Sequence, residues 1–339
     1  MRRASRHLTP RQDIVKTLFA DADTNNSLKL GAVNSINWAR ILAQIVYYFH
    51  SYFSLAKKSP TFKVGDKLRA VVPTGNFGDI LAGYFAHRMG LPLEKLVVAT
   101  NENDILDRFW KTGRYEKKAA PAGSQDDGGL AVDGAQAHED GVRATLSPAM
   151  DILVSSNFER LLWYLAYEYA AAAGMDDEWN KKQAGQEVTA WLGALRTRGG
   201  FGPVADEILA SARTTFASER VSDAQTLDTI RDLYAQVGYV LDPHSAVGVA
   251  AAERSRAGGD GAALPHVALS TAHPAKFAGA VELALKGVEG FDFRTVLPAE
   301  FVEMESRERR VTSVENDWKA VREIVKRQVE EELAGGGGH

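Results

Sequence analysis

The sequence predicts an α/β protein built on an open, twisted and mostly parallel sheet with flanking helices. Two apolar runs typical of buried strands, 68–72 and 96–99, enclose a helical segment, 80–89, that ends at Gly90 and Pro92. This strand–helix–strand order is a βαβ unit, and the two strands of such a unit are parallel. With 339 residues, 45% of them hydrophobic, the chain is long enough for one large α/β domain or for two domains.

The composition excludes several classes of protein. The chain has 40 Lys and Arg against 44 Asp and Glu, whereas a general nucleic-acid-binding surface needs an excess of basic side chains. It has no cysteine, so disulfides, thiolate metal sites and cysteine nucleophiles are ruled out. The longest apolar stretch, 41–55, contains Gln44, His50 and Ser51 and is too short to span a membrane. We therefore expect a cytoplasmic protein with a small-molecule ligand, and neither a nucleic acid nor a membrane as partner.

Helical periodicity defines the first elements. Residues 13–20 form a short helical segment, and a longer helix begins near Asn34 and Ser35, either of which can cap it. Its apolar stripe is broad enough that we expect it to be buried. The stripe consists of Trp38, Ile41, Leu42, Ile45, Phe49 and Phe53.

The middle of the chain contains a segment that cannot form a core. Residues 117–143 are rich in Gly, Ala, Asp and Gln and predict a disordered surface insertion. After it, the sequence predicts a short strand at 152–154. A capping box between Ser156 and Glu159 then predicts a helix that runs to about Ala172.

Helices and short strands alternate in the remainder. Residues 177–236 are mostly helical with an interruption at Gly199. Apolar runs at 239–241 and 266–269 predict two further strands. A capping box between Thr312 and Glu315 predicts the last helix, and residues 334–339 form a flexible glycine tail.

The sharpest local signal is the glycine turn between the first predicted strand and its helix. Its residues are Gly75, Asn76, Phe77, Gly78 and Asp79. Glycines in such a turn let backbone N–H groups close around an anion, and the positive end of the helix dipole adds to the attraction. The turn therefore predicts a binding site for a single phosphate.

Two other interpretations of the turn stay open at this point. A dinucleotide site has the spacing Gly-x-Gly-x-x-Gly, whereas here Gly75 and Gly78 are three apart and Gly83 follows. Glu102 stands where such a site places its ribose-binding carboxylate, but Asp79 at the helix start would repel a second phosphate. The turn can also serve only to bring the strand and helix close together.

Polar residues elsewhere are candidates for the same site. Asn34, Ser35 and Asn37 cluster at a helix N-terminus, where they can bind an anion or merely cap the helix. Residues 101–104 end a strand on the edge where α/β sheets bind ligands, and they can equally cap the next helix. The histidines predict no metal site, because few other ligands lie near them in the sequence.

Several blocks of sequence, in this order, resemble the threonine synthases found in fungi and some bacteria. The resemblance runs from about Gln12 to about Leu333. It is carried by the glycine turn and by the blocks 31–40, 99–106, 146–152, 155–160, 241–244 and 269–277.

The resemblance implies the type II pyridoxal-phosphate-enzyme fold, in which two α/β domains hold the cofactor between them. It implies that residues 75–79 bind the phosphate of pyridoxal 5'-phosphate and that Thr271 contacts the pyridine nitrogen. A neutral hydroxyl there leaves the ring nitrogen largely unprotonated. Without the resemblance, Thr271 is simply a capping hydroxyl after a strand.

The implied reaction converts O-phospho-L-homoserine and water to L-threonine and phosphate. It is the last step of threonine biosynthesis, and the enzyme that the resemblance implies is a lyase. The candidates for contact with the substrate phosphate are Asn34, Ser35, Asn37, Asn101 and Lys276.

The lysine that forms the Schiff base in this family precedes the Asn34 block, and no matching segment occurs here. Lys63 follows Phe62 but lies in a polar loop. We therefore expect a fold that is incomplete at the N-terminus, with the catalytic lysine outside this chain. The expected partner is the missing N-terminal half, unless the chain is a monomer.

The resemblance also implies a domain organisation. Residues 1–11 are a leader, 12–56 are the end of a smaller domain with its linking helix, and 57–333 form the large cofactor-binding domain. The alternative function is a catalytically inactive cofactor-domain fragment that binds a phosphate ligand or a protein partner.

Overall fold

The computed structural model describes residues 9–31, 34–117, 141–259, 261–304, 306–309 and 311–334. Its contacts divide the chain into two compact units, one formed by Met1–Asn34 with Glu303–His339 and the other by Ser35–Val302. Most of the predicted insertion, the first eight residues and the glycine tail lie outside the described residues. The domain boundaries given above stay predictions.

The larger unit is built on a four-stranded parallel sheet with the strand order β5-β2-β1-β6. The strands are β1 (Leu68–Pro73), β2 (Leu93–Thr100), β5 (Phe216–Arg220) and β6 (His266–Ala268). In the centre of the sheet Val71 pairs with Val97 on one side and with Ala268 on the other. The predicted α/β class and parallel sheet are confirmed.

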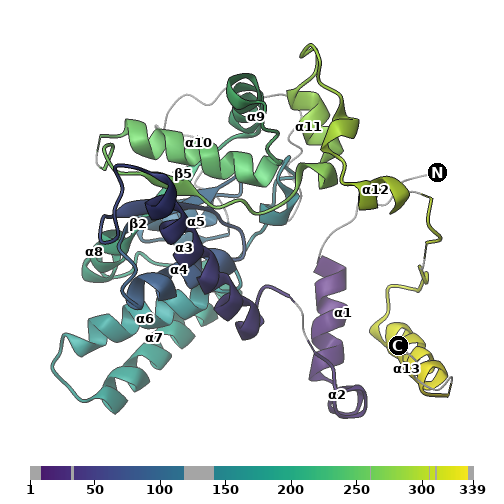
Figure 1. Cartoon of the computed structure of the whole chain (residues 1–339). Helices are drawn as coiled ribbons and strands as arrows, with labels where there is room; N and C mark the ends of the chain where they lie inside the picture. The colour runs from purple at the N-terminus through teal and green to yellow at the C-terminus, as the bar shows by residue number, and fades with distance from the viewer. Residues whose placement is uncertain are drawn as a thin grey trace. The chain divides into compact units, whose positions relative to one another are not determined.

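Successive side chains of the central strand β1 point to opposite faces and enter different cores. Ala70 and Val72 join the larger apolar cluster, and Val71 joins a second one. Helices α4 (Gly78–Arg88), α5 (Ile105–Thr112) and α8 (Asp206–Thr215) pack on the first face, and α10 (Pro243–Ala257) packs on the second (Figure 1). The sheet is therefore covered on both faces, which fits the burial of its central strand β1 along its whole length.

Other elements complete the two units. In the larger unit these are α3 (Trp38–Lys58), α6 (Phe158–Ala171), α7 (Asp177–Arg198), α9 (Asp223–Val237), α11 (Ala278–Ala284) and the short helices Pro148–Met150, Pro274–Lys276 and Phe293–Val296. A two-stranded antiparallel sheet pairs β3 (Tyr115–Glu116) with β4 (Gly200–Phe201). Helix α12 (Ala299–Met304) crosses the boundary between the units. The smaller unit contains α1 (Thr9–Ala20), α2 (Ala22–Leu28) and α13 (Trp318–Ala334), and α1 packs against α13.

Helix α3 starts later than predicted. Its N-cap is Asn37, whose Oδ1 accepts a hydrogen bond from the Ala39 N–H at 2.9 Å. Neither Asn34 nor Ser35 caps it, because the chain enters the helix only at Trp38.

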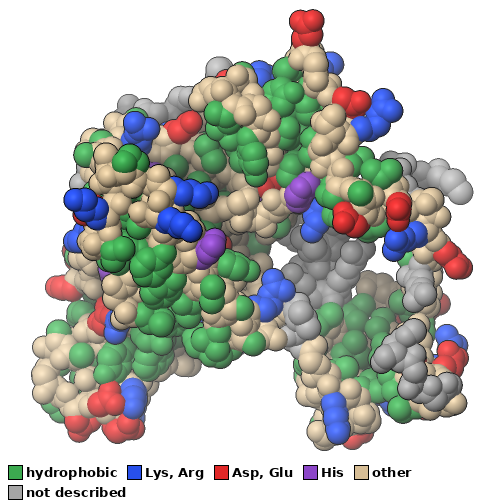
Figure 2. Space-filling model, in the orientation of Figure 1, with side chains coloured by type: hydrophobic (Ala, Val, Ile, Leu, Met, Phe, Trp, Pro, Cys, Tyr) green, Lys and Arg blue, Asp and Glu red, His purple; other side chains and the backbone are tan. Residues whose placement is uncertain are grey.

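The buried face of α3 also differs from the predicted stripe. Ile41, Tyr48 and Tyr52 are buried, whereas Trp38 and Leu42 are about half exposed. Phe53 is exposed as well, and Figure 2 shows apolar side chains gathered over this region. Tyrosine was not counted as an apolar position in the pattern, although its ring packs well in a core.

Two predicted strands and two predicted capping boxes are wrong. Residues 152–154 and 239–241 pair with no strand within the described residues. Helix α6 begins at Phe158 without a side-chain cap. In α13 the cap is Asp317, which accepts from the N–H groups of Lys319 and Ala320 at 2.9 Å. No helix in the described ranges is long and apolar enough to cross a membrane.

Candidate functional site

The glycine turn lies where the central strand β1 meets α4. Thr74 fixes its start, because its N–H donates to the Ala99 carbonyl at 2.7 Å and its hydroxyl donates to the Val72 carbonyl at 2.6 Å. The turn therefore leaves the sheet at its carboxyl edge, the edge where ligands bind in open parallel sheets.

Phe77 ends the turn in an unusual backbone conformation. Its φ of 61° lies in the left-handed region, which costs a non-glycine residue on the order of 1 kcal/mol or more. Its ring is buried against Phe158 and Phe216, with centroids 5.2 and 6.1 Å away. This packing holds the strained residue in place at the N-terminus of α4.

Gly75 and Gly83, which both belong to the glycine pattern of this segment, have different roles. A Cβ on Gly75 would stand 3.0 Å from the Ala149 carbonyl oxygen and 3.1 Å from the Met150 Cα, so a larger residue there would push the turn and the facing segment apart by a few tenths of an ångström. A Cβ on Gly83 would stand 2.6 Å from the Tyr48 ring. Gly83 therefore allows α3 and α4 to pack closely and does not belong to the turn.

The turn presents a row of free backbone donors. Within the described residues, the N–H groups of residues 75–80 have no acceptor, and α4 has no side-chain cap. The first N–H groups of a helix lack intrahelical partners, and the helix dipole places partial positive charge beside them. Unsatisfied donors of this kind form a binding site for an anion.

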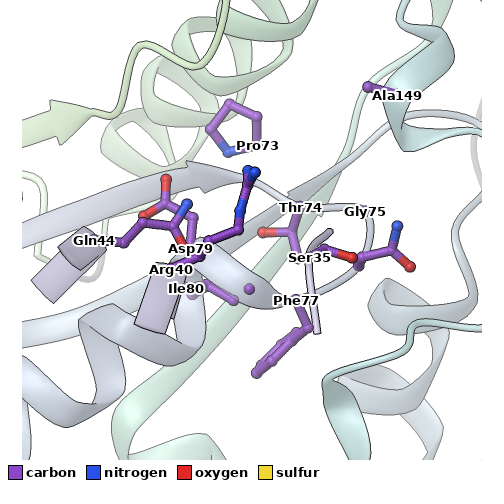
Figure 3. Close-up of a pocket in the computed structure, with 12 residues that line it drawn as sticks. Ser35, Arg40, Gln44, Pro73, Thr74, Gly75, Phe77, Asp79, Ile80 and Ala149 are labelled. Atoms are coloured by element: carbon purple, nitrogen blue, oxygen red, sulfur yellow. The ribbon is translucent and has the colours of Figure 1, made fainter. Parts of the chain in front are cut away.

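A cavity of about 190 Å³ opens in front of these donors (Figure 3). Its lining comes from the start of α3, from the end of β1 with the turn, and from the short helix at 148–150. The lining residues are Ser35, Arg40, Gln44, Pro73, Thr74, Gly75, Asn76, Phe77, Gly78, Asp79, Ile80 and Ala149. The cavity is large enough for a phosphate group.

Arg40 is the one cation among the described lining residues, and its role was not predicted from the sequence. It extends from the first turn of α3 toward the space below Pro73 (Figure 3). In the part of the chain that the structure describes, its guanidinium has neither an ion pair nor a hydrogen bond. The sequence feature that could have identified Arg40 is its position three residues after the cap Asn37, inside the block 31–40 that carries the resemblance.

Asp79 is the only carboxylate among the described residues that line the cavity. Burial raises the pKa of Asp79 to about 6, although a hydrogen bond from Tyr48 opposes this effect. Its Oδ1 is buried without a hydrogen-bond partner, and the Tyr48 hydroxyl donates to the Asp79 main-chain carbonyl at 2.8 Å. Near neutral pH this carboxyl can therefore gain or lose a proton beside a bound anion.

Asn157 joins two walls of the cavity. Its Nδ2 donates to the Ser35 carbonyl at 2.9 Å and to the Asn76 carbonyl at 2.8 Å. Arg160 donates to Asn157 Oδ1 at 2.6 Å and to the Ile36 carbonyl at 2.9 Å. Asn157 thus serves the turn and the entrance to α3, which is why it does not cap its own helix.

The remaining candidates lie at different places. Ser35 lines the cavity, and Asn37 is occupied in capping α3. Asn34 belongs to the other compact unit. Asn101 is buried, and its Nδ2 donates to groups of Thr145, Ser147 and Asp151 at 2.8–3.3 Å. Asn101 therefore organises the segment that leads to Ala149 and does not itself line the cavity.

Thr271 and Lys276 follow β6 and do not line the cavity. Both side chains are exposed, and the Thr271 N–H donates to the Ser245 hydroxyl at 3.1 Å. Since β6 is parallel to β1, Thr271 lies beyond the same edge of the sheet as the glycine turn. Within the described residues, no group of three or more His, Asp or Glu could hold a metal ion.

Comparisons with known proteins agree on one family. A sequence profile described as "Threonine synthase, C-terminal" matches residues 245–325. The chain is 48% identical over 328 residues to a threonine synthase of Saccharomyces cerevisiae, covering 95% of this chain and 57% of the yeast protein. It is 41% identical over 316 residues to that of Pseudomonas aeruginosa, covering 93% and 56% of the two chains.

Solved structures give the same result for the fold. The crystal structure of threonine synthase from yeast superposes with a TM-score of 0.79 at 46% identity, covering 98% of this chain and 59% of that chain. A pyridoxal-phosphate-bound threonine synthase from Brucella melitensis superposes with a TM-score of 0.72 at 38% identity, covering 95% and 58%. The chain thus spans somewhat more than half the length of the relatives that it matches.

Proposed function

The chain is homologous to the threonine synthases over almost all of its length, and we propose that it carries the pyridoxal-5'-phosphate site of such an enzyme. The proposed reaction is the conversion of O-phospho-L-homoserine and water to L-threonine and phosphate, catalysed in the cytoplasm. Because the chain spans 57% of its yeast relative, the activity is proposed for the enzyme to which this chain contributes.

The observation that carries the proposal is the set of free N–H donors at residues 75–80, which face a cavity that also contains Arg40. Together they fit a single phosphate: donors from the turn, the positive end of α4 and one guanidinium. Gly75 fits this role because a residue without a Cβ lets the turn lie close to Ala149. A dinucleotide is disfavoured because Asp79 lines the cavity, and its carboxylate would repel the negative charge of a second phosphate.

Pyridoxal phosphate supplies an electron sink for the carbanion chemistry of the reaction. In this chain, residues 75–79 hold the phosphate, and Arg40 neutralises part of its charge. Thr271, after β6, is proposed to contact the ring nitrogen through its hydroxyl. Among the substrate-phosphate candidates, Ser35 has the strongest support because it lines the cavity, whereas Asn34, Asn37, Asn101 and Lys276 stay predictions.

The experiment that tests the proposal separates binding from turnover. Purified chain is first titrated with pyridoxal 5'-phosphate, with NADH as a comparison, while tryptophan fluorescence is recorded. It is then incubated with the cofactor and O-phospho-L-homoserine, and released phosphate and threonine are measured. The proposal expects saturable cofactor binding that Gly75→Ala weakens by about tenfold or more.

The two steps also decide between the proposed functions. Product formation would assign the complete activity to this chain. Cofactor binding without product would favour the inactive cofactor-domain fragment as the description of this chain by itself. Absence of cofactor binding, or tighter binding of NADH, would contradict the proposal.

A further inference from the structure

The N-terminus of α10 is a buried, hydrogen-bonded turn that the phosphate site does not by itself require. Asp242 caps the helix: its Oδ1 accepts from the N–H groups of His244 at 2.8 Å and Ser245 at 3.2 Å. All three side chains are buried, and the pKa of Asp242 is lowered by these hydrogen bonds despite its burial. This stretch, Asp242, His244 and Ser245, is called the α10 bracket below.

His244 connects the bracket to the wall of the phosphate cavity. Its Nε2 lies 3.1 Å from the N of Ala149, and its Nδ1 lies 3.2 Å from Asp242 Oδ1. A backbone N–H can only donate, so Nε2 is the acceptor and Nδ1 carries the hydrogen that Asp242 accepts. The imidazole ring packs against Phe277, with centroids 4.6 Å apart, so its orientation is fixed.

Ala149 is the residue against which the glycine turn is packed. Its carbonyl oxygen lies 3.0 Å from the position of a Cβ on Gly75, and the residue lines the cavity. The hydrogen bond from Ala149 to His244 therefore sets how closely this wall approaches the turn.

Ser245 connects the same bracket to a second place at the sheet edge. Its hydroxyl oxygen accepts from the Thr271 N–H at 3.1 Å and lies 3.4 Å from the Ser270 hydroxyl. The adjacent residues His244 and Ser245 thus bind the main chain at Ala149 and at Thr271, which are more than a hundred residues apart in the sequence.

We infer that Asp242, His244 and Ser245 are positioning residues that fix the separation between the phosphate subsite and Thr271. The inference rests on the proposed function, because it treats residues 75–79 and Thr271 as contacts to opposite ends of one cofactor. Asp242 holds both neighbours, His244 positions the phosphate end through Ala149, and Ser245 positions the ring end through Thr271. Neither His244 nor Ser245 needs to touch the cofactor.

The test uses two polar replacements of His244 that differ in reach. In His244→Gln the side-chain oxygen can take the place of Nε2 and accept from Ala149. In His244→Asn the amide can still donate to Asp242 but is too short to reach Ala149. Inorganic phosphate is titrated into each variant at pH 8 by calorimetry, and pyridoxal 5'-phosphate is titrated in parallel.

We expect His244→Asn to bind both ligands about tenfold more weakly than wild type, and His244→Gln to stay within about threefold. Ser245→Ala should weaken binding of pyridoxal phosphate by about threefold to tenfold and leave inorganic phosphate unchanged, because only the ring end loses its support. A purely structural role would instead lower both affinities in all three variants.

His266→Gln is the matched control. His266 also makes two hydrogen bonds, to the Leu264 carbonyl at 2.9 Å and to the Ser255 hydroxyl at 3.2 Å, but it does not line the cavity. It should bind both ligands as wild type does.

Equal phosphate affinity in His244→Asn and wild type would overturn the role of His244. Loss of inorganic phosphate binding in Ser245→Ala would overturn the division between the two ends. Failure of the wild-type chain to bind either ligand would instead contradict the proposed function itself.

Discussion

Asn157 and Asn76 are joined by two hydrogen bonds to one carbonyl group. The main-chain N–H and the side-chain Nδ2 of Asn157 both donate to the Asn76 carbonyl oxygen, at 3.1 and 2.8 Å. The same Nδ2 also reaches the Ser35 carbonyl at 2.9 Å. The fully buried amide of Asn157, directly before α6, therefore determines where the glycine turn stands relative to the residues before α3.

Replacement of Asn157 by Ala should damage both stability and binding. The partly buried carbonyls of Ser35 and Asn76 lose a donor and the buried Asn157 side chain leaves a gap, so we expect the free energy of unfolding to fall by about 2–4 kcal/mol. Phosphate affinity should fall by about tenfold, since the turn is no longer held. Denaturant unfolding and phosphate titration measure the two effects. Asn180→Ala on α7, another buried Asn, is the control and should lose stability without losing phosphate affinity.

Gly75→Ala should weaken phosphate binding by about tenfold or more. The added methyl group would meet the Ala149 carbonyl oxygen at 3.0 Å, so the turn or the facing segment has to move. Gly193→Ala on α7 is the matched control, because a Cβ there meets nothing within 4 Å. That change should stabilise the helix by about 0.5–1 kcal/mol and leave binding intact. Comparable phosphate affinity in the two variants would refute the role given to the turn.

Asp79→Asn should make the protein more stable at neutral pH. Burial raises the pKa of Asp79 from 3.8 to about 6, so the folded state binds this proton more tightly than the unfolded state. The ionised Asp79 carboxylate therefore destabilises the folded wild type. This destabilisation is absent below the pKa of Asp79 in the unfolded state, grows between pH 4 and 6, and is complete above its pKa in the folded state. It amounts to at most ~3 kcal/mol. Unfolding curves of wild type and variant should therefore coincide near pH 3.5 and separate at pH 7.5.

The same substitution should change how binding depends on pH. Above pH 6 the ionised carboxylate in wild type repels a bound anion, whereas the amide of the variant is neutral at every pH. The ratio of phosphate affinities, variant over wild type, should rise as pH increases from 5 to 8. A ratio that stays constant over this range would show that Asp79 keeps one charge state in the cavity.

Arg40→Gln should weaken phosphate binding without weakening the fold. Among the described residues its guanidinium has no ion pair, so the free energy of unfolding should change by less than about 0.5 kcal/mol. Phosphate affinity should fall by about tenfold. The affinity of the variant should also decrease less steeply with rising salt concentration than that of wild type. Arg294→Gln, a largely exposed arginine that does not line the cavity, provides the control for a loss of one positive charge.

The sequence predicted the centre of the fold because its signals there are local. Strands β1 and β2 contain the apolar runs 70–73 and 96–99 on either side of α4, and such runs are typical of a parallel sheet buried on both faces. Strand β5 escaped prediction because only Phe216 in it is fully buried and Glu219 and Arg220 follow. Tyr48 and Tyr52 were missed as core residues of α3 because tyrosine, with its polar hydroxyl group, was not counted as an apolar position.

The glycine turn was predictable for the same reason, since its residues are contiguous. Arg40 and Asn157 were not, because their importance depends on approaching the turn from helices far away in the sequence. Asn101 is a candidate for which the structure shows a second role. Its place at the end of β2 suggested ligand contact, but hydrogen bonds within the protein use its amide.

The most direct test of the account is a ³¹P NMR titration of pyridoxal 5'-phosphate with the intact chain and with Gly75→Ala. The account predicts a distinct bound phosphorus resonance for the wild-type chain, which excess inorganic phosphate displaces and which is much weaker in the variant at the same ligand concentration. A bound resonance of equal intensity in Gly75→Ala, or none in the wild type, would contradict the claim that residues 75–80 form the cofactor-phosphate site.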